Sequence, residues 1–495
     1  MKHLLVFYIS AEAEPFVKVG GLGDVAGSLP AAIQNISLEP GNDIPIDIRL
    51  VIPFHKTIDA PSTPFQYLGK YLVPMPHRKG NYARVFTTRS KGVTVYLIGG
   101  KPIENHPSVY SMDTWRDGDK YVFFSKAALM LPEFLHLQPN IFHCNDWHTA
   151  LVNYLLDRQK IVKTRYKNCS SIITIHNLPF MGGGIEGALE RFGIEPATDP
   201  VLPEWSRRFP LPMGMSKADK IIAVSPNYAR ELMTSEFGCG LQEFLSSRKH
   251  LLTGIINGID VEEWNPASDP LISVPFTTTF IEKRIGNKLS LQQEFHLKPE
   301  PQIPILAMVS RLDPQKGVDL IPSALRAIID LPWQAILLGS GSPDIQNQLL
   351  NLAQEYPSRV KVILKFDAAL SHRIYAGSDI LLMPSRYEPC GLSQMIAMRY
   401  GCIPVAHATG GLVDTILDPS IASPGTGFLY EGKEAHHLAE ALRRSLSIFT
   451  FAPVQWGKIQ IAAMQQDFSW SKSAKKYVKT YLDVAKLNHT SGENE

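Results

Sequence analysis

The sequence lacks an excess of charge of either sign. Its 49 lysines and arginines are balanced by 47 aspartates and glutamates, so the formal net charge is only +2. Proteins that bind nucleic acid or an anionic membrane surface usually carry a strong basic bias. We therefore predict no nucleic-acid partner and no membrane partner, and an anionic ligand would have to be met by a local group of cations.

Cysteines are few, and long apolar runs are absent. The cysteines show neither CxxC pairs nor zinc-ligand spacing, which fits a reduced, cytoplasmic setting; they are Cys144, Cys169, Cys239, Cys390 and Cys402. No segment approaches the ~20 apolar residues that cross a bilayer. The apolar start MKHLLVFYIS is short and is followed by Glu12 and Glu14 where a signal peptide would need its cleavage region, so we expect no signal peptide.

Three common catalytic or nucleotide-binding motifs are also missing. The chain has no GxSxG elbow and no GxxxxGK[ST] loop, which argues against an esterase and a P-loop enzyme. Its glycine-rich segment is not the GxGxxG fingerprint of dinucleotide-binding domains.

What the chain does contain is a repeated alternation of apolar, β-branched runs with helix-like stretches. This alternation is typical of an α/β fold built on parallel sheets. The predicted strands cover residues 4–10, 46–52, 93–98, 141–144, 171–176, 220–225, 303–310, 334–339, 361–365, 379–384 and 403–406.

At 495 residues, the chain exceeds one ordinary core, so we expect two large domains. The segment WNPASDPLISVPF breaks both periodicities and places the boundary near Glu262. We predict an N-terminal Rossmann-like domain over residues 1–262 and a C-terminal Rossmann-like domain over residues 263–470. An amphipathic helix over residues 471–487 is expected to return to the first domain, and residues 488–495 are expected to form a disordered tail.

Glycines and charged residues gather just after the predicted strands. In open α/β sheets, ligands bind at the carboxyl ends of the strands. In the first half, KVGGLGDV brings Lys18, Gly20 and Gly21 to such an end, just before a helix predicted to begin near Asp24, where backbone amides could approach a phosphate. A tight turn without a ligand is the alternative.

The second half repeats this pattern. SRLDPQKG places Arg311 and Lys316 on one loop, and Gly317 is predicted to open the helix that follows. Two cations on one loop suit a departing diphosphate, although a solvated loop is the alternative. In SRYEPCGLSQ, Glu388 could orient sugar hydroxyls or act only as a charge at a helix N-terminus. We interpret Cys390 as a small buried residue.

Two histidines follow strands without a metal-binding pattern. His148 and His176 lack an HxxxH or carboxylate partner spacing, so no metal site is predicted. Each could be a hydrogen-bonded structural residue, and the position of His176 at a strand end favours a catalytic role.

Taken together, KVGGLGDV, NDWHTAL, TIHN, GIINGID, SRLDPQKG, SRYEPCGLSQ and HATGGL resemble bacterial glycogen synthases and plant starch synthases, over nearly the whole chain. The resemblance implies a GT-B fold, in which two Rossmann-like domains face each other across a deep cleft. It also implies glucosyl transfer from ADP-glucose or UDP-glucose to an α-1,4-glucan acceptor, with retention of configuration and without a metal or other cofactor.

The resemblance assigns roles to named residues. The catalytic residues would be His176, Arg311, Lys316 and Glu388. The donor would be bound by Lys18, Gly20, Gly21, Asn257, Phe366, Gly391, Leu392, Ser393, Thr409, Gly410 and Gly411. The acceptor side would be lined by Asp24, Tyr110, Asp146 and His148.

The chain departs from the family pattern at two places. Phe366 stands where the family often has Tyr, so the aromatic ring is kept and the hydroxyl is lost. The loop around residues 119–121 also differs from the family pattern.

Three other functions stay open as alternatives: a sucrose-type or other small-acceptor transferase, a non-catalytic glucan-binding relative and a nucleotide-dependent oxidoreductase. The sequence leaves open the choice between ADP and UDP, the acceptor length, allosteric control and whether the chain forms a homo-oligomer.

Overall fold

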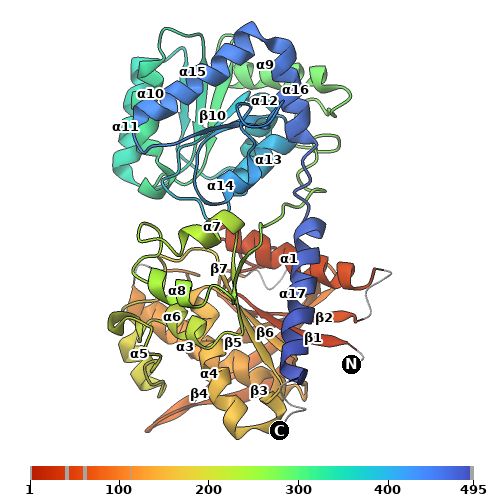
Figure 1. Cartoon of the computed structure of the whole chain (residues 1–495), viewed down its shortest axis with the longest axis vertical. Coiled ribbons are helices and arrows are strands. Elements are labelled where there is room, and N and C mark those ends of the chain that lie inside the picture. Colours follow the sequence, from red (N-terminus) through yellow and green to blue (C-terminus); the bar gives the residue numbers. More distant parts are fainter. Residues whose placement is uncertain (1–2, 40–43, 59–63, 112, 491–495) are drawn as a thin grey trace. The chain divides into compact units, whose positions relative to one another are not determined.

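The computed structural model describes residues 3–39, 44–58, 64–111 and 113–490 of the chain. The chain divides into two compact units (Figure 1). The first unit comprises residues 1–258 and 470–495, and the second comprises residues 259–469. The first break lies close to the boundary predicted near Glu262.

The first unit is built on one mixed sheet. Among the described residues, its strands are β1 (Leu4–Ile9), β2 (Ile46–Pro53), β3 (Gln66–Met75), β4 (Arg78–Ser90), β5 (Val93–Gly99), β6 (Ile141–Asn145), β7 (Ser170–Ile175), β8 (Lys220–Ala223) and β9 (Leu252–Gly254). They lie in the order β3-β4-β5-β2-β1-β6-β7-β8-β9. From β5 to β9 neighbouring strands are parallel, whereas β3 and β4 extend the sheet as an antiparallel hairpin.

The central strands are buried on both faces. Every residue of β1, LLVFYI, is buried, and so is every residue of β6 and β7. Continuous apolar runs of this kind are typical of parallel strands that are covered by helices on both sides. The helices of this unit are α1 (Gly21–Ser37), α2 (Lys101–Glu104), α3 (Thr114–Phe134), α4 (Trp147–Val162), α5 (Glu186–Arg191), α6 (Pro210–Ser216), α7 (Pro226–Glu231), α8 (Gln242–Ser247) and α17 (Trp470–Thr490).

The C-terminal helix α17 belongs to the first unit, where it packs beside α1 (Figure 1). Its buried side chains recur at helical spacing and join the core beneath the sheet; they are Trp470, Ala474, Tyr477, Val478, Tyr481, Val484 and Ala485. Tyr481 also places its hydroxyl 2.6 Å from Nδ1 of His143 in β6. The helix is assigned as far as Thr490, beyond the start of the predicted tail at 488, and residues 491–495 of that tail lie outside the described residues.

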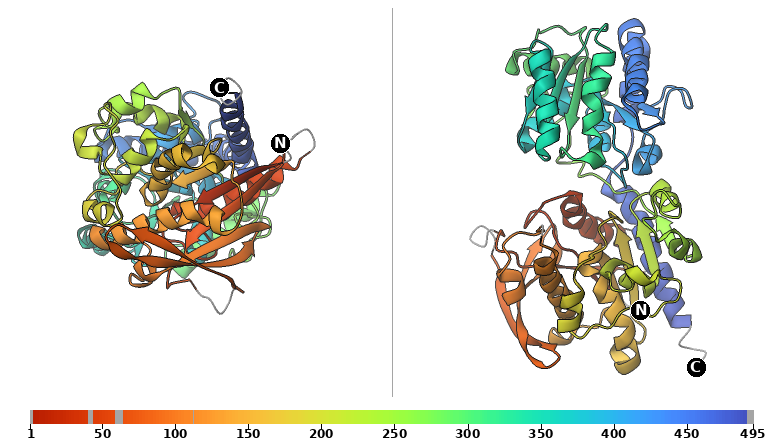
Figure 2. Two further views of the ribbon diagram at one scale, coloured as in Figure 1. Left: turned by 90° about the horizontal axis from the view of Figure 1, so that it is seen from below. Right: turned by 90° about the vertical axis from the view of Figure 1, so that its left-hand side faces the viewer.

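The second unit is a parallel sheet with helices on both sides, as the right-hand view of Figure 2 shows. Its strands are β10 (Ile305–Val309), β11 (Gln334–Leu338), β12 (Val360–Ile363), β13 (Ile380–Met383), β14 (Ile403–His407) and β15 (Phe428–Tyr430), in the order β12-β11-β10-β13-β14-β15. Its helices are α9 (Arg284–Glu294), α10 (Ile321–Ala327), α11 (Pro343–Glu355), α12 (Ala368–Gly377), α13 (Ser393–Arg399), α14 (Gly410–Thr415), α15 (Ala435–Phe451) and α16 (Pro453–Met464).

Short 3-10 turns complete both units. They span Thr164–Tyr166, Glu204–Ser206, Ile281–Lys283, Pro314–Lys316 and Val318–Leu320. Two sequence expectations need correction here. Helix α1 begins at Gly21 rather than near Asp24, and Gly317 is followed by a 3-10 turn, with α10 starting only at Ile321.

Candidate active site

The glycine-rich turn connects β1 to α1 in the first unit. Gly20 precedes the helix in an extended conformation, and Gly21 is its first residue. A Cβ atom at Gly23 would lie 3.0 Å from Cγ of Lys18, and one at Gly27 would lie 2.5 Å from the carbonyl oxygen of Glu14. The glycines therefore let the turn lie directly against the helix. Among the described residues, no side-chain hydrogen bond caps the start of α1.

Lys18 is held by two carboxylates beside this turn. Its Nζ lies 2.5 Å from Oδ1 of Asp24 and 3.3 Å from Oε2 of Glu14. Burial raises the pKa of the Asp24 carboxyl to about 6, against the opposing charge of Lys18. Asp24, predicted for the acceptor side, therefore contacts the lysine that was predicted for the donor.

Glu12 organises the same turn, and we did not predict it from the sequence. Its carboxylate accepts hydrogen bonds from the backbone N–H groups of Val19 and Gly20 and from the hydroxyl of Tyr110, which lies 3.0 Å away. Glu12 is almost completely buried, and burial raises the pKa of its carboxyl. The only sequence signal was an acidic residue just after a buried strand.

Asp146 and His176 come together after β6 and β7. Oδ1 of Asp146 accepts the backbone N–H of His176 at 2.7 Å. Asp146 has a φ of +54°, which is uncommon for a residue other than glycine and typical of functional turns. Its carboxyl is buried, which raises its pKa to about 7.

Asn145 fixes the orientation of the His176 ring. Nδ2 of Asn145 donates to the carbonyl of Ile9, so its Oδ1 is the acceptor for Nε2–H of His176 at 2.9 Å. Burial lowers the pKa of His176 to about 3, so the ring is neutral near pH 7 and Nδ1 keeps its lone pair. His176 can therefore accept a hydrogen bond at Nδ1.

His148 lies in an aromatic enclosure at the start of α4. The rings of Tyr110, Tyr121 and Trp147 lie 4.8, 4.6 and 4.2 Å from its ring, centroid to centroid. The side chain is buried, which lowers its pKa, and within the described part of the chain Nδ1 has no hydrogen-bond partner. A buried nitrogen without a partner is unusual and points to a group that is completed by a ligand.

Asn257 shows the same feature after β9. The residue is 6% exposed, and its Oδ1 has no hydrogen-bond partner among the described residues. Because a buried unpaired amide oxygen costs free energy, a hydroxyl-bearing ligand would satisfy it.

In the second unit, Lys316 and Glu388 form an ion pair. Nζ of Lys316 lies 2.6 Å from Oε2 of Glu388, and the Glu388 side chain is only 6% exposed. The hydroxyl of Ser385, which sequence analysis missed, donates to the same oxygen at 3.0 Å. Arg311 lies on the loop before Lys316, is 61% exposed and pairs with Asp313 at 2.6 Å.

Backbone packing holds these two loops together. A Cβ atom at Gly317, whose φ is +61°, would lie 1.9 Å from the carbonyl oxygen of Pro384, so only glycine fits. Arg386 binds both carboxylate oxygens of Asp319 at 2.7 Å. The loop of Lys316 is thereby fixed against the loop of Glu388.

The turn from Thr409 to Gly411 packs on the other side of Glu388. Added Cβ atoms at Gly410 and Gly411 would lie 2.0 Å from the carbonyl oxygen of Glu388 and 2.2 Å from that of Cys390. The backbone N–H of Gly411 donates to the carbonyl of Glu388 at 3.0 Å. Thr409 is buried beside them.

The remaining predicted donor residues lie at the same end of the sheet. Gly391 has a φ of +74° and is followed by Leu392 and Ser393, where the short helix α13 begins. Phe366, just after β12, is 85% exposed. An aromatic ring this exposed can stack on a nucleobase.

Neither a metal centre nor a membrane span is found in the part of the chain that the structure describes. No three His, Cys, Asp or Glu side chains are grouped there as metal ligands would be. None of the described helices is both long and apolar enough to cross a membrane.

Comparisons with known proteins find relatives over nearly the whole chain. Residues 5–247 match the family model of the starch synthase catalytic domain, and residues 292–448 match that of glycosyl transferases group 1. The glycogen synthase of Lactobacillus acidophilus is 38% identical over 97% of this chain and 99% of its own, and that of Anoxybacillus flavithermus is 36% identical over 97% and 98%.

Two solved structures are also similar. The catalytic domain of starch synthase IV from Arabidopsis thaliana, bound to ADP and acarbose, is 31% identical, with a TM-score of 0.88 over 98% of this chain and 100% of that one. Sucrose-phosphate synthase from Thermosynechococcus elongatus is 19% identical, with a TM-score of 0.62 over 97% and 99%, and shares the fold alone. The predicted GT-B fold is confirmed, and the chain belongs to the glycogen synthase and starch synthase family of retaining glycosyltransferases.

Proposed function

We propose that the protein transfers glucose from ADP-glucose or UDP-glucose to the non-reducing end of an α-1,4-glucan, with retention of configuration. The observation that carries this proposal is the ion pair between Lys316 and the buried Glu388 at the carboxyl ends of parallel strands, with Arg311 on the same loop as Lys316. Cations here suit a departing diphosphate, and a carboxylate suits sugar hydroxyls.

Departure of the nucleoside diphosphate is the step that these cations assist. When the bond between the anomeric carbon and the diphosphate breaks, negative charge grows on the leaving oxygen. Lys316 uses one of its three N–H donors on Glu388 and can direct others to that oxygen. Arg311 supplies paired donors to the phosphate oxygens. The family resemblance assigns Lys18 to the diphosphate as well, and with these cations for the leaving group we propose that no metal or other cofactor takes part.

The transferred glucose would meet neutral hydrogen-bonding groups. His176 presents a lone pair at Nδ1, and the unpaired Oδ1 of Asn257 can accept a sugar hydroxyl. On the acceptor side, we propose that Asp146, His148 and Tyr110 orient the attacking 4-hydroxyl. Burial raises the pKa of Asp146 to about 7, so its carboxylate could take up a proton near neutral pH.

The solved starch synthase that is similar to this chain contains ADP and acarbose, which supports ADP-glucose as the donor and an α-glucan as the acceptor. Phe366 would stack on the base but has no hydroxyl to select it. Among the described residues the five cysteines form no disulfide bond, which supports a reducing, cytoplasmic setting.

A transfer assay tests the proposal. The protein is incubated with glycogen and either radiolabelled ADP-glucose or radiolabelled UDP-glucose, and label is counted in precipitated polymer. We expect label in the polymer, with ADP-glucose as the better donor. Label found only on a small sugar acceptor would replace the proposal with a small-acceptor transferase, and no transfer from either donor would refute it.

A further inference from the structure

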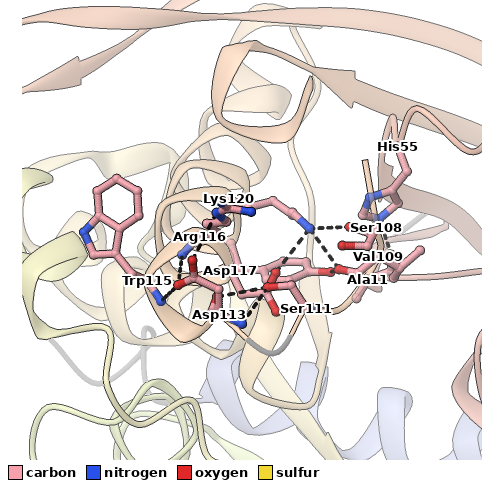
Figure 3. A network of polar contacts seen from close by, with 11 residues as sticks. Ala11, His55, Ser108, Val109, Ser111, Asp113, Trp115, Arg116, Asp117 and Lys120 are labelled. Carbon is pink, nitrogen blue, oxygen red and sulfur yellow. Dashed lines mark hydrogen bonds and ion pairs between the residues drawn. The ribbon is translucent and has the colours of Figure 1, made fainter. Parts of the chain in front are cut away.

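Lys120 of helix α3 is a fully buried lysine that lies outside the catalytic groups described above. Its side chain has 0% exposure, and that of its ion-pair partner Asp117 has 6%. Nζ donates to the carbonyl oxygens of Ser108 at 2.6 Å and Val109 at 3.0 Å, and to Oδ1 of Asp117 at 3.3 Å (Figure 3). All three N–H donors of the ammonium are therefore used within the protein.

These bonds tie the loop before α3 to the helix on both sides of Tyr110. The other carboxylate oxygen of Asp117 accepts the backbone N–H of Ser111 at 2.8 Å (Figure 3). The hydroxyl of Tyr121 donates to the carbonyl of Val109 at 2.6 Å. Tyr110 stands between these anchored residues, so the position of its ring follows from them.

Tyr110 in turn contacts the residue that organises the glycine-rich turn. Its hydroxyl donates to Oε1 of Glu12, and Oε2 of Glu12 accepts the backbone N–H groups of Val19 and Gly20. The ammonium of Lys120 is thus linked to the backbone of the turn by hydrogen bonds on either side of Tyr110, which the covalent chain joins to the anchored Val109. Nothing in this series of links depends on the second unit.

A buried ion pair is a costly way to stabilise a helix. Desolvating two charges offsets most of their attraction, and well-packed apolar side chains often serve stability as well or better. A lysine with three fixed bonds instead imposes one geometry on the loop that it binds.

We propose that Lys120 is a positioning residue that holds the glycine-rich turn in its ligand-binding form through Tyr110 and Glu12. The effect on the turn follows from the first unit alone. The effect on catalysis rests on the proposed function, because it requires this turn to bind the donor diphosphate.

The same helix offers a matched control. Lys126 also donates to two backbone carbonyls, those of Pro74 and Phe192, both at 2.9 Å. Neither carbonyl belongs to the Tyr110 loop or to the glycine-rich turn. Lys126→Met therefore removes a similar lysine from α3 without touching the proposed series.

The test combines amide hydrogen exchange with kinetics on the full chain. Lys120→Met should speed exchange in peptides covering residues 12–22 by about tenfold and raise the donor KM by about tenfold. Lys126→Met should do neither. Tyr110→Phe should speed the same exchange by a similar factor. Exchange in the double variant should be no faster than in the faster single variant, because both residues act in one series. Lys120→Arg, which keeps the charge, should restore most of the loss.

Three results would overturn the proposal. The first is a Lys120→Met variant with lower thermal stability but unchanged exchange in residues 12–22 and unchanged donor KM. The second is the same rise in donor KM in Lys126→Met, and the third is an exchange rate in the Lys120→Met/Tyr110→Phe variant that equals the product of the two single effects. If Lys120→Met does not fold, Asp117→Asn weakens the same anchor, and unchanged exchange in residues 12–22 of that folded variant would overturn it equally. If the wild type transfers no glucose, the proposed function fails, while the exchange measurement still decides the positioning role.

Discussion

Replacing Lys316 with alanine removes the cation that is paired with the buried carboxylate of Glu388. In the wild type, Nζ of Lys316 lies 2.6 Å from Oε2 of Glu388, whose side chain is 6% exposed. If the ammonium stabilises charge that grows on the departing diphosphate, its contribution is larger in the transition state than in the bound donor. We expect kcat to fall by about 10² to 10³, with a much smaller change in donor KM.

The same substitution also has a structural cost. Without Lys316, the Glu388 carboxylate keeps only the hydroxyl of Ser385 among the described residues. A buried charged group left underpaired costs more than the roughly 1–3 kcal/mol of a neutral polar group. The double variant Lys316→Ala/Glu388→Gln removes the unpaired charge and should regain much of that stability. It should not regain activity.

The assay is a comparison of kcat, donor KM and thermal unfolding for the wild type, the single variant and the double variant. Lost turnover in a folded single variant, with stability but not activity regained in the double variant, supports the assigned role. A kcat near that of the wild type in Lys316→Ala would refute it and would leave Lys316 as a structural ion-pair partner.

The remaining predictions concern three other positions. Burial raises the pKa of Asp146 from 3.8 to about 7, so the folded state binds more protons than the unfolded state between these values and loses stability as the pH rises through them. Asp146→Asn should therefore gain free energy of unfolding relative to the wild type as the pH rises from about 4 to about 7. A pH-independent difference in urea titrations would contradict this. Gly410→Ala should destabilise the protein by about 2 kcal/mol or more and reduce activity, because the added Cβ would lie 2.0 Å from the carbonyl oxygen of Glu388. The control is Gly457→Ala, whose added Cβ meets nothing within 4 Å. It should leave the midpoint of thermal unfolding unchanged or raise it. Cys390→Ser should keep most activity and lose some thermal stability, because Cys390 is 4% exposed; a loss of several orders of magnitude in turnover would show a chemical role for the thiol.

The sequence predicted the central strands well because they are buried on both faces. A strand such as β1 reads as an unbroken apolar run, and its position follows from that run alone. The hairpin of β3 and β4 was missed because many of its side chains are exposed and its apolar residues alternate with polar ones. The short strands β9 and β15, with three residues each, give too little pattern to detect.

The candidate site divides in the same way. Motif residues at strand ends, such as Lys316 and Glu388, could be placed because parallel strands bring their carboxyl ends to one edge of a sheet. Glu12 and Lys120 could not, because their partners are mainly backbone groups and the roles of these residues depend on the conformation of distant loops. The pairing of Lys18 with Asp24 was missed for a similar reason. It depends on the first turn of α1, which begins at Gly21, three residues earlier than the predicted start of the helix.

The most direct test of the proposed reaction is to follow it by proton NMR, with a nucleoside diphosphate glucose and a short maltooligosaccharide as substrates. We predict that an α-1,4 anomeric signal grows in step with release of the nucleoside diphosphate, and that Lys316→Ala slows both by about 10² or more. Release of nucleoside diphosphate with free glucose as the only sugar product, or the appearance of a β-linked product, would contradict the account.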